Sequence, residues 1–104
     1  TWWDSGDLNL FLTYALANYR IDEKCVYVTG LSMGGAGTWG LGGVGHARIA
    51  AIAPICGAAS ANSTSAQNLL NSKVSVWAFH AQNDGTVVVG RSDGWMNSFG
   101  TKLS

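Results

Sequence analysis

Charged residues are scarce in this sequence. They make up 12% of the 104 residues, and six Lys and Arg balance six Asp and Glu, so the formal net charge is zero. This balance gives no electrostatic reason to expect nucleic acid or an anionic membrane surface as a partner. No apolar run is long enough to cross a bilayer, and the N-terminus lacks the basic-then-apolar pattern of a signal peptide. We therefore expect neither nucleic acid nor membrane among the partners, and the sequence leaves the oligomeric state open.

Cysteine is scarce as well, with two residues. Cys25 begins one predicted strand, and Cys56 ends the next strand of the same parallel sheet. A five-residue strand rises about 16 Å, whereas the Cα atoms of a disulfide lie within about 7 Å of each other. We therefore expect no disulfide and two small, buried thiols. The His, Cys and Asp residues show no metal-ligand spacing and no glycine-rich stretch resembles a phosphate-binding loop, so we expect no metal and no cofactor.

Glycine, by contrast, is abundant, with 14 residues, and the most informative stretch of the chain ends in a pair of glycines. An apolar run with β-branched residues comes first, a Gly-x-Ser-x-Gly motif follows, and a segment of small residues comes after it. This order is typical of a nucleophile elbow, in which a serine occupies a tight turn from strand to helix. We expect strained backbone at Ser32, and we expect side chains at Gly30 and Gly34 to collide with the neighbouring strand and helix. The motif consists of Gly30, Leu31, Ser32, Met33 and Gly34.

Hydrophobic periodicity predicts alternating helices and strands. An apolar face at helical spacing predicts a helix over 5–20, with Asp4, Ser5 or Asp7 as its cap. Further helices are predicted at 33–45 and 92–99, strands at 25–29, 47–55 and 74–80, and a loop over 58–72 with a short helix near 67–70. The continuous apolar character of 47–55 predicts a strand covered on both faces. Together these elements predict an α/β fold with a parallel sheet.

Three parallel strands leave sheet faces and edges that need further cover. The sequence also begins at Thr1 rather than at a methionine. We therefore expect residues 1–104 to form the central part of one larger α/β domain. Within it, Trp39 is expected to anchor the glycine-rich helix in the core, and Trp77, in the middle of a predicted strand, is also expected to be buried.

Several stretches of the chain resemble one protein family in their order and spacing. The resemblance is to the secreted α/β-hydrolase esterases related to polyhydroxybutyrate depolymerases, feruloyl and acetyl-xylan esterases, and predicted prolyl-oligopeptidase-like peptidases. It extends from about Leu8 to Phe99 and implies an α/β-hydrolase fold and a secreted or periplasmic protein. The stretches are Ile21-Asp22, Val26 to Gly35, Gly37-Thr38-Trp39, Ile52 to Gly57, and Val76 to His80 followed by Asp84.

The resemblance implies a role for three of these residues. Ser32 would be the nucleophile, Asp84 the acid of a catalytic triad, and the backbone N–H of Met33 one half of an oxyanion hole. The catalytic histidine of the family lies on a loop that would follow Ser104, and its second oxyanion donor lies on a His-Gly-type loop that would precede Thr1, so both fall outside this chain. The sequence also departs from the family at Val88-Val89, where a proline often follows the valine.

The chemistry of acyl transfer explains why these residue types belong together. A serine hydroxyl is a poor nucleophile until a histidine accepts its proton, and an acid must hold that histidine in the correct tautomer. The chain order Ser, Asp, His is that of α/β-hydrolases. The nearby His80 could be mistaken for the base, but we expect it to form hydrogen bonds within the loop that positions Asp84, and we expect His46 to be solvated.

Asp84 is favoured over Asp93 as the acid because it follows a strand directly, whereas Asp93 lies within a helix. A purely structural role for Asp84, as an Asx-turn residue before Gly85, remains open.

The resulting hypothesis is a serine esterase that cleaves carboxylic esters through an acyl-enzyme, with a carbohydrate-linked feruloyl or acetyl ester or a polyester as substrate. The 104-residue piece alone is expected to be inactive, because the base and one oxyanion donor are missing. One alternative is a serine peptidase of the prolyl-oligopeptidase-like type. Another is a non-catalytic, hydrolase-like module that binds a glycan or a partner protein through Trp2, Trp3, Trp77 and Trp95.

Overall fold

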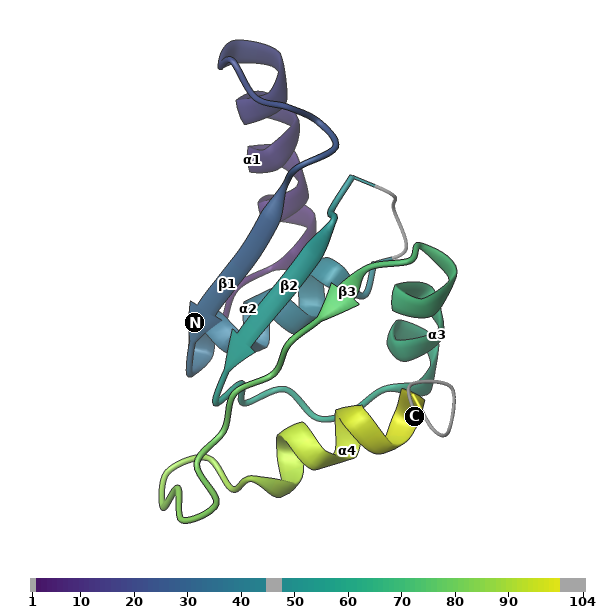
Figure 1. Cartoon of the computed structure of the whole chain (residues 1–104). Coiled ribbons are helices and arrows are strands. Elements are labelled where there is room, and N and C mark those ends of the chain that lie inside the picture. Colours follow the sequence, from purple (N-terminus) through teal and green to yellow (C-terminus); the bar gives the residue numbers. More distant parts are fainter. Residues whose placement is uncertain (1, 45–47, 100–104) are drawn as a thin grey trace.

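A computed structural model describes residues 2–44 and 48–99 of the chain (Figure 1). Helices and strands alternate, as the periodicity of the sequence predicts. The elements are α1 (Ser5–Asn18), β1 (Tyr27–Leu31), α2 (Met33–Gly42), β2 (Ala51–Ile55), α3 (Ser63–Asn71), β3 (Ser75–Val76) and α4 (Gly90–Phe99).

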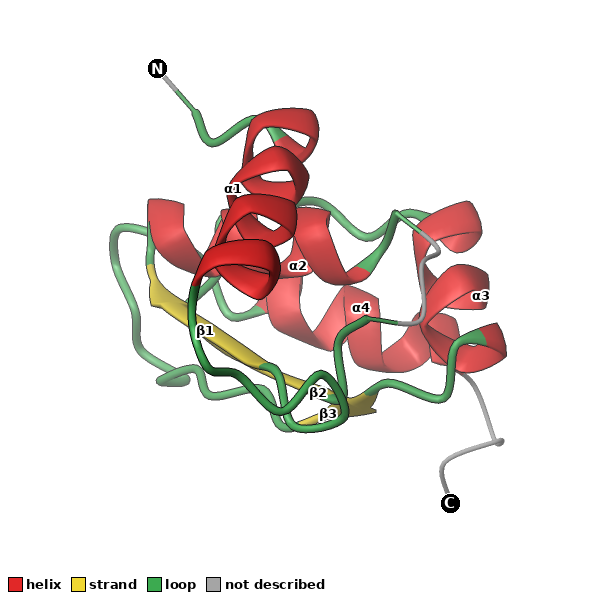
Figure 2. Cartoon of the chain, turned by 90° about the horizontal axis from the view of Figure 1, so that it is seen from above, coloured by secondary structure: helices red, strands yellow, loops and turns green. Residues whose placement is uncertain are grey.

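The three strands form a parallel sheet in the order β1-β2-β3. Its register pairs Tyr27 with Ala51 and Leu31 with Ile55, while β2 pairs with β3 from Ala51 opposite Ser75. The helices lie on one side of this sheet (Figure 2). The predicted α/β architecture with a parallel sheet is therefore confirmed.

Helix α2 carries the core of the molecule. Trp39 is fully buried, as predicted, and its ring stacks on Trp95 of α4 at a centroid distance of 4.4 Å with nearly parallel planes. Ile52 of β2 and Leu69 of α3 are also buried, and a Cβ added at Gly42 of α2 would lie 3.1 Å from the side chain of each. The small residues of α2 thus let it lie close against the sheet, which a helix with larger side chains could not do.

The strand boundaries differ from the prediction. The turn at 22–25, in which the Asp22 carboxylate accepts the Lys24 N–H, delays the start of β1 to Tyr27, and pairing with β2 extends the strand through Gly30 to Leu31. Strand β2 is shorter than predicted and begins at Ala51. Strand β3 has only two residues, although the Phe79 N–H still donates to the Pro54 carbonyl. The predicted strand positions are right, and their ends are wrong by several residues.

The helices also differ from the prediction. The segment predicted to be mostly loop contains the nine-residue helix α3, because the Asn62 side chain accepts the Ser65 N–H and so caps its first turn. Asp4 caps α1 in the same way, as one of the predicted candidates. Helix α1 has no fully buried residue, and Phe11, expected on its apolar face, is 70% exposed.

The other face of the sheet is uncovered by the described residues. Ile55 of β2 points to this open face, so the cover predicted for the second face of β2 does not come from the described residues. Trp77 was expected in the core but is 71% exposed, because it lies on the same face and packs beside Phe79. Cys25 and Cys56 are free thiols, as predicted, but Cys25 is exposed rather than buried, because it lies in the turn before β1.

Candidate active site

Ser32 lies between β1 and α2, at the turn that the sequence motif predicts. Its backbone has φ 57° and ψ −110°, a conformation that is strained for a residue with a side chain. Its N–H donates to the Ile55 carbonyl at 2.9 Å and its carbonyl accepts the Ala36 N–H at 3.0 Å, so neighbouring strand and helix hold it on both sides. The side chain makes no capping hydrogen bond to α2. The hydroxyl is therefore not used to stabilise the helix, and Ser32 as a residue is partly exposed.

Two glycines allow the turn to form. A Cβ at Gly30 would overlap the carbonyl group of Gly34 and lie 2.9 Å from its Cα. A Cβ at Gly35 would lie 2.7 Å from both the Ile55 carbonyl oxygen and the Gly57 Cα. The prediction for Gly30 is confirmed. The prediction for Gly34 is wrong, because a Cβ there meets no described atom within 4 Å; the close contact with the end of β2 falls on Gly35 instead.

The start of α2 presents backbone amides beside Ser32. Met33 is the first residue of the helix, and the first amides of an α-helix have no acceptor within it. The helix dipole adds a partial positive charge at the same end. The Met33 N–H thus belongs to a helix end that can stabilise negative charge next to the serine, which is the position an oxyanion donor needs. Leu31, on the other side of Ser32, is the last residue of β1.

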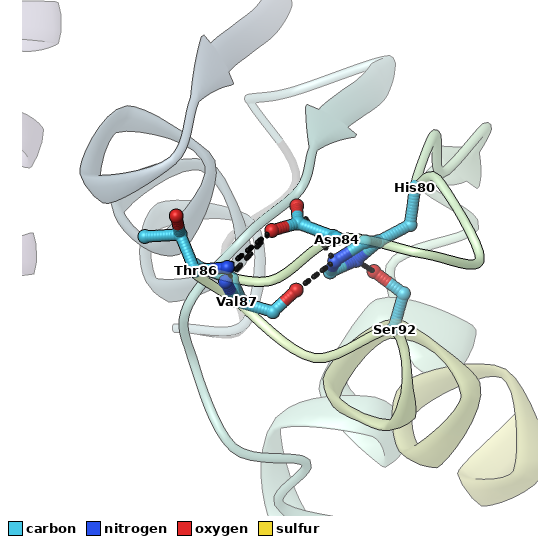
Figure 3. Close-up of polar contacts among 5 residues, drawn as sticks. All are labelled: His80, Asp84, Thr86, Val87 and Ser92. Atoms are coloured by element: carbon cyan, nitrogen blue, oxygen red, sulfur yellow. Dashed lines mark hydrogen bonds and ion pairs between the residues drawn. The ribbon is translucent and has the colours of Figure 1, made fainter.

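Asp84 lies in a tight loop after the end of β3 (Figure 3). Its Oδ1 accepts the N–H groups of Thr86 and Val87, each at 2.9 Å, which is an Asx-type turn. Its Oδ2 lies 3.4 Å from Nε2 of His80, and the carboxylate side chain is 18% exposed. Asp84 therefore has the Asx-turn role that the sequence left open. The turn uses Oδ1, and Oδ2 can still accept a hydrogen bond.

These contacts lower the pKa of the Asp84 carboxyl below its ordinary value of 3.8. The N–H group of Val87 contributes most and that of Thr86 next, and the adjacent His80 acts in the same direction, while partial desolvation opposes them. Hydrogen bonds donated to the ionised form favour that form. Asp84 is consequently an anion at neutral pH, as an acid that supports an imidazolium must be.

His80 forms hydrogen bonds within this loop, as predicted. Its Nδ1 lies 2.7 Å from the Ser92 hydroxyl and its Nε2 lies 2.6 Å from the Val87 carbonyl oxygen. The imidazole is 3% exposed, so both ring nitrogens are occupied and the ring is closed to solvent. No sequence signal identifies Ser92 as a partner of His80, because serine is common in the first turn of a helix and the contact with His80 depends on the tertiary structure. The other histidine, His46, lies outside the described residues.

Ser32 and the Asp84 loop lie at the same end of the sheet (Figure 1). The ends of the strands are linked by backbone hydrogen bonds, from Ser32 to Ile55 and from Cys56 to Phe79, the residue before His80. Cys56 also has a positive φ of 40°, so two neighbouring strand ends carry unusual backbone. Within the described residues the polar contacts of Asp84 do not include Ser32. The carboxyl edge of an open α/β sheet is where ligands bind.

Comparison with known proteins identifies the fold. A solved structure described as a thermostable esterase aligns with a TM-score of 0.78 and 33% sequence identity, over 88% of this chain and 24% of that chain. The fold is that of an α/β-hydrolase over the part these residues span. This chain thus corresponds to about a quarter of the esterase's length. No protein-family model and none of the curated proteins matches the sequence.

Residues 2–44 and 48–99 contain no group of three or more His, Cys, Asp or Glu side chains arranged to hold a metal ion. Over the same ranges, no helix combines the length and apolar character needed to cross a bilayer.

Proposed function

We propose that this chain carries the nucleophile and the acid of a serine hydrolase that cleaves carboxylic esters. The observation that carries the proposal is the backbone of Ser32, which is strained, framed by Gly30 and Gly35, and placed beside the first amide of α2. Strain of this kind persists only where the surrounding structure imposes it, and it gathers at functional sites. The likeness to a thermostable esterase supports the same conclusion.

In this proposal Ser32 attacks the acyl carbon of the ester while a histidine takes its proton, and the Met33 N–H stabilises the oxyanion. Asp84, kept ionised by Val87 and Thr86, uses Oδ2 to orient that histidine. Loss of the alcohol leaves an acyl-enzyme, which water then hydrolyses. The buried and doubly bonded His80 is unsuited to be the base. The base is a histidine outside these 104 residues, and the second oxyanion donor lies outside them too.

The residues belong, in this proposal, to the centre of a larger domain. The open face of the sheet supports this, because Tyr27, Leu31 and Trp77 expose large apolar side chains there. The substrate proposed is a feruloyl or acetyl ester on a carbohydrate, or a polyester, and the location proposed is extracellular or periplasmic. Both rest on the family resemblance of the motifs around Ser32 and Asp84.

The test uses the intact natural protein in which these residues occur, as wild type and as Ser32→Ala. We expect turnover of p-nitrophenyl acetate and covalent labelling by a fluorophosphonate in the wild type, and neither in the variant. A peptide anilide measured beside the ester separates an esterase from a peptidase. The 104-residue chain alone should show no turnover, since it lacks the base; Ser32-dependent turnover from it would contradict the proposed placement of that base.

The alternative of a non-catalytic glycan-binding module makes a different prediction. Trp2, Trp3 and Trp77 are exposed and could stack on sugars, whereas Trp95 is buried against Trp39 and could not. Glycan binding by the intact protein, combined with no fluorophosphonate labelling of Ser32, would favour that module over the hydrolase.

A further inference from the structure

The buried imidazole of His80 has no part in the proposed chemistry, yet it is the most highly bonded side chain near Asp84. It touches three groups: the Ser92 hydroxyl in α4, the Val87 carbonyl, and the Asp84 carboxylate (Figure 3). Ser92 is itself 5% exposed. Burying a polar group costs free energy unless its hydrogen bonds are satisfied, and all the partners of His80 are present. This arrangement suggests a specific role for His80.

The partners determine where the proton of His80 resides. A carbonyl oxygen can only accept a hydrogen bond, so Nε2, at 2.6 Å from the Val87 oxygen, must carry a hydrogen. In the neutral ring Nδ1 then accepts the hydrogen bond of the Ser92 hydroxyl at 2.7 Å. The Nε2–H group also faces Asp84 Oδ2 at 3.4 Å. The imidazole is therefore a donor toward the loop, and Ser92 fixes its orientation from the opposite side.

The result is that Val87 is held at both ends. Its N–H donates to Asp84 Oδ1, and its carbonyl accepts from His80 Nε2. The Asp84 carboxylate is thereby tied to the ring through Val87 as well as facing it directly. Rotation of the carboxylate would break the Asx turn and the ring contact together. Oδ2 stays directed out of the turn, as a triad acid requires of the oxygen that receives a histidine N–H.

We propose that His80, braced by the buried Ser92 hydroxyl of α4, is a positioning residue that fixes the orientation of the Asp84 carboxylate. This inference rests on the proposed function, because it assigns Asp84 to the triad. His80 acts through Asp84 and Val87, and it neither touches substrate nor transfers a proton.

A matched pair of variants in the intact protein tests the role. His80→Gln places an amide N–H at about the position of Nε2 and can still donate to Val87, whereas the shorter His80→Asn reaches only the position of Nδ1. We expect His80→Asn to lower kcat about 100-fold with KM nearly unchanged, the size of effect that a misplacement of about 1 Å produces. His80→Gln should recover most of that loss. Ser92→Ala, which keeps the ring and removes its brace, should lower kcat about tenfold, as the loss of one neutral hydrogen bond would.

Hydrogen exchange supplies a readout that does not depend on activity. The Thr86 and Val87 amides should exchange faster in His80→Asn and stay protected in His80→Gln. Equal loss of kcat in both variants with unchanged exchange would overturn the inference in favour of a chemical role, and unchanged kcat in both would overturn it as well. Turnover that depends on Ser32 but not on His80 contradicts only this inference, whereas Ser32→Ala with wild-type turnover contradicts the proposed function itself.

Discussion

The Ser32 turn and the Asp84 loop lie at the same end of the sheet but are shaped by different forces. At Ser32 the backbone itself is constrained: φ is 57°, and no side chain fits at Gly30 or Gly35. At Asp84 the shape comes from hydrogen bonds, two from backbone amides and one contact with His80. One region is set by steric exclusion and the other by polar contacts.

This difference matters for how each region responds to mutation. A steric constraint tolerates almost no added volume but is indifferent to pH. A hydrogen-bonded constraint tolerates isosteric substitution but depends on charge and on every partner in the network. The two regions can therefore be separated experimentally by choosing changes that affect volume alone or charge alone.

The largest effect should come from removing the charge of Asp84 without changing its shape. Asp84→Asn keeps the oxygen that accepts the Thr86 and Val87 amides, so the loop should remain folded. Turnover by the intact protein should nevertheless fall by about 10⁴-fold, as it does where a triad acid is neutralised. The exposed Asp93→Asn in α4 is the matched control and should retain wild-type kcat. Near-normal turnover of p-nitrophenyl acetate by Asp84→Asn would leave Asp84 with its structural role alone.

Adding volume at Gly30 should destabilise the protein rather than only inactivate it. The Cβ of Gly30→Ala would overlap backbone of Gly34, which cannot move without displacing α2 from the sheet. We expect a loss of about 3 kcal/mol in the free energy of unfolding, the upper part of the usual range for overpacking. Urea denaturation of wild type and variant measures it. A variant as stable as wild type would show that β1 and α2 can separate at little cost.

The Ser32 turn was the more predictable of the two regions because its constraint is local. A strand, two glycines around a serine and a helix are consecutive in the chain, so the local sequence is enough to predict the tight turn at Ser32. The wrongly assigned glycine is informative: a side chain at Gly35 would collide with the Ile55 carbonyl at the end of β2 and with Gly57 just after it, and no local pattern reveals this collision. Asp84 was predicted from the family resemblance and preferred to Asp93 because it directly follows a strand, but Ser92 could not be predicted, because it meets His80 only through the packing of α4.

The remaining differences between prediction and structure concern what covers the sheet. The apolar character of β2 and of Trp77 predicts burial, and the described residues cover only one face. Apolar composition reports what a strand needs for stability, not which segment supplies it. The ends of the strands were misplaced for a similar reason, since the turn around Asp22 and the pairing of Gly30 with Pro54 set the limits of β1, and propensity does not.

Acid should weaken the Asp84 loop and leave the Ser32 turn unaffected. The pKa of Asp84 is lowered in the folded protein, so its stabilising contribution is complete above the unfolded value of 3.8 and disappears as the pH falls through the lower folded value. The difference in unfolding free energy between wild type and Asp84→Asn should therefore shrink as the pH falls below about 5. Denaturation at a series of pH values measures this difference. A difference that stays constant with pH would mean that Val87 and Thr86 do not favour the anion.

The smallest effect is expected at Gly34, and it completes the steric comparison with Gly30. Both glycines belong to the same motif, but a Cβ at Gly34 meets no described atom within 4 Å. Because alanine is favoured over glycine in a helix by up to about 1 kcal/mol, Gly34→Ala should leave the unfolding free energy unchanged or raise it by no more than that. The unfolding free energies of Gly34→Ala and Gly30→Ala, measured under identical urea conditions, separate the effect of overlap with the backbone from that of helix propensity. A loss at Gly34 as large as that at Gly30 would mean that atoms outside the described residues fill the space beside it, and that the motif needs both glycines for steric reasons.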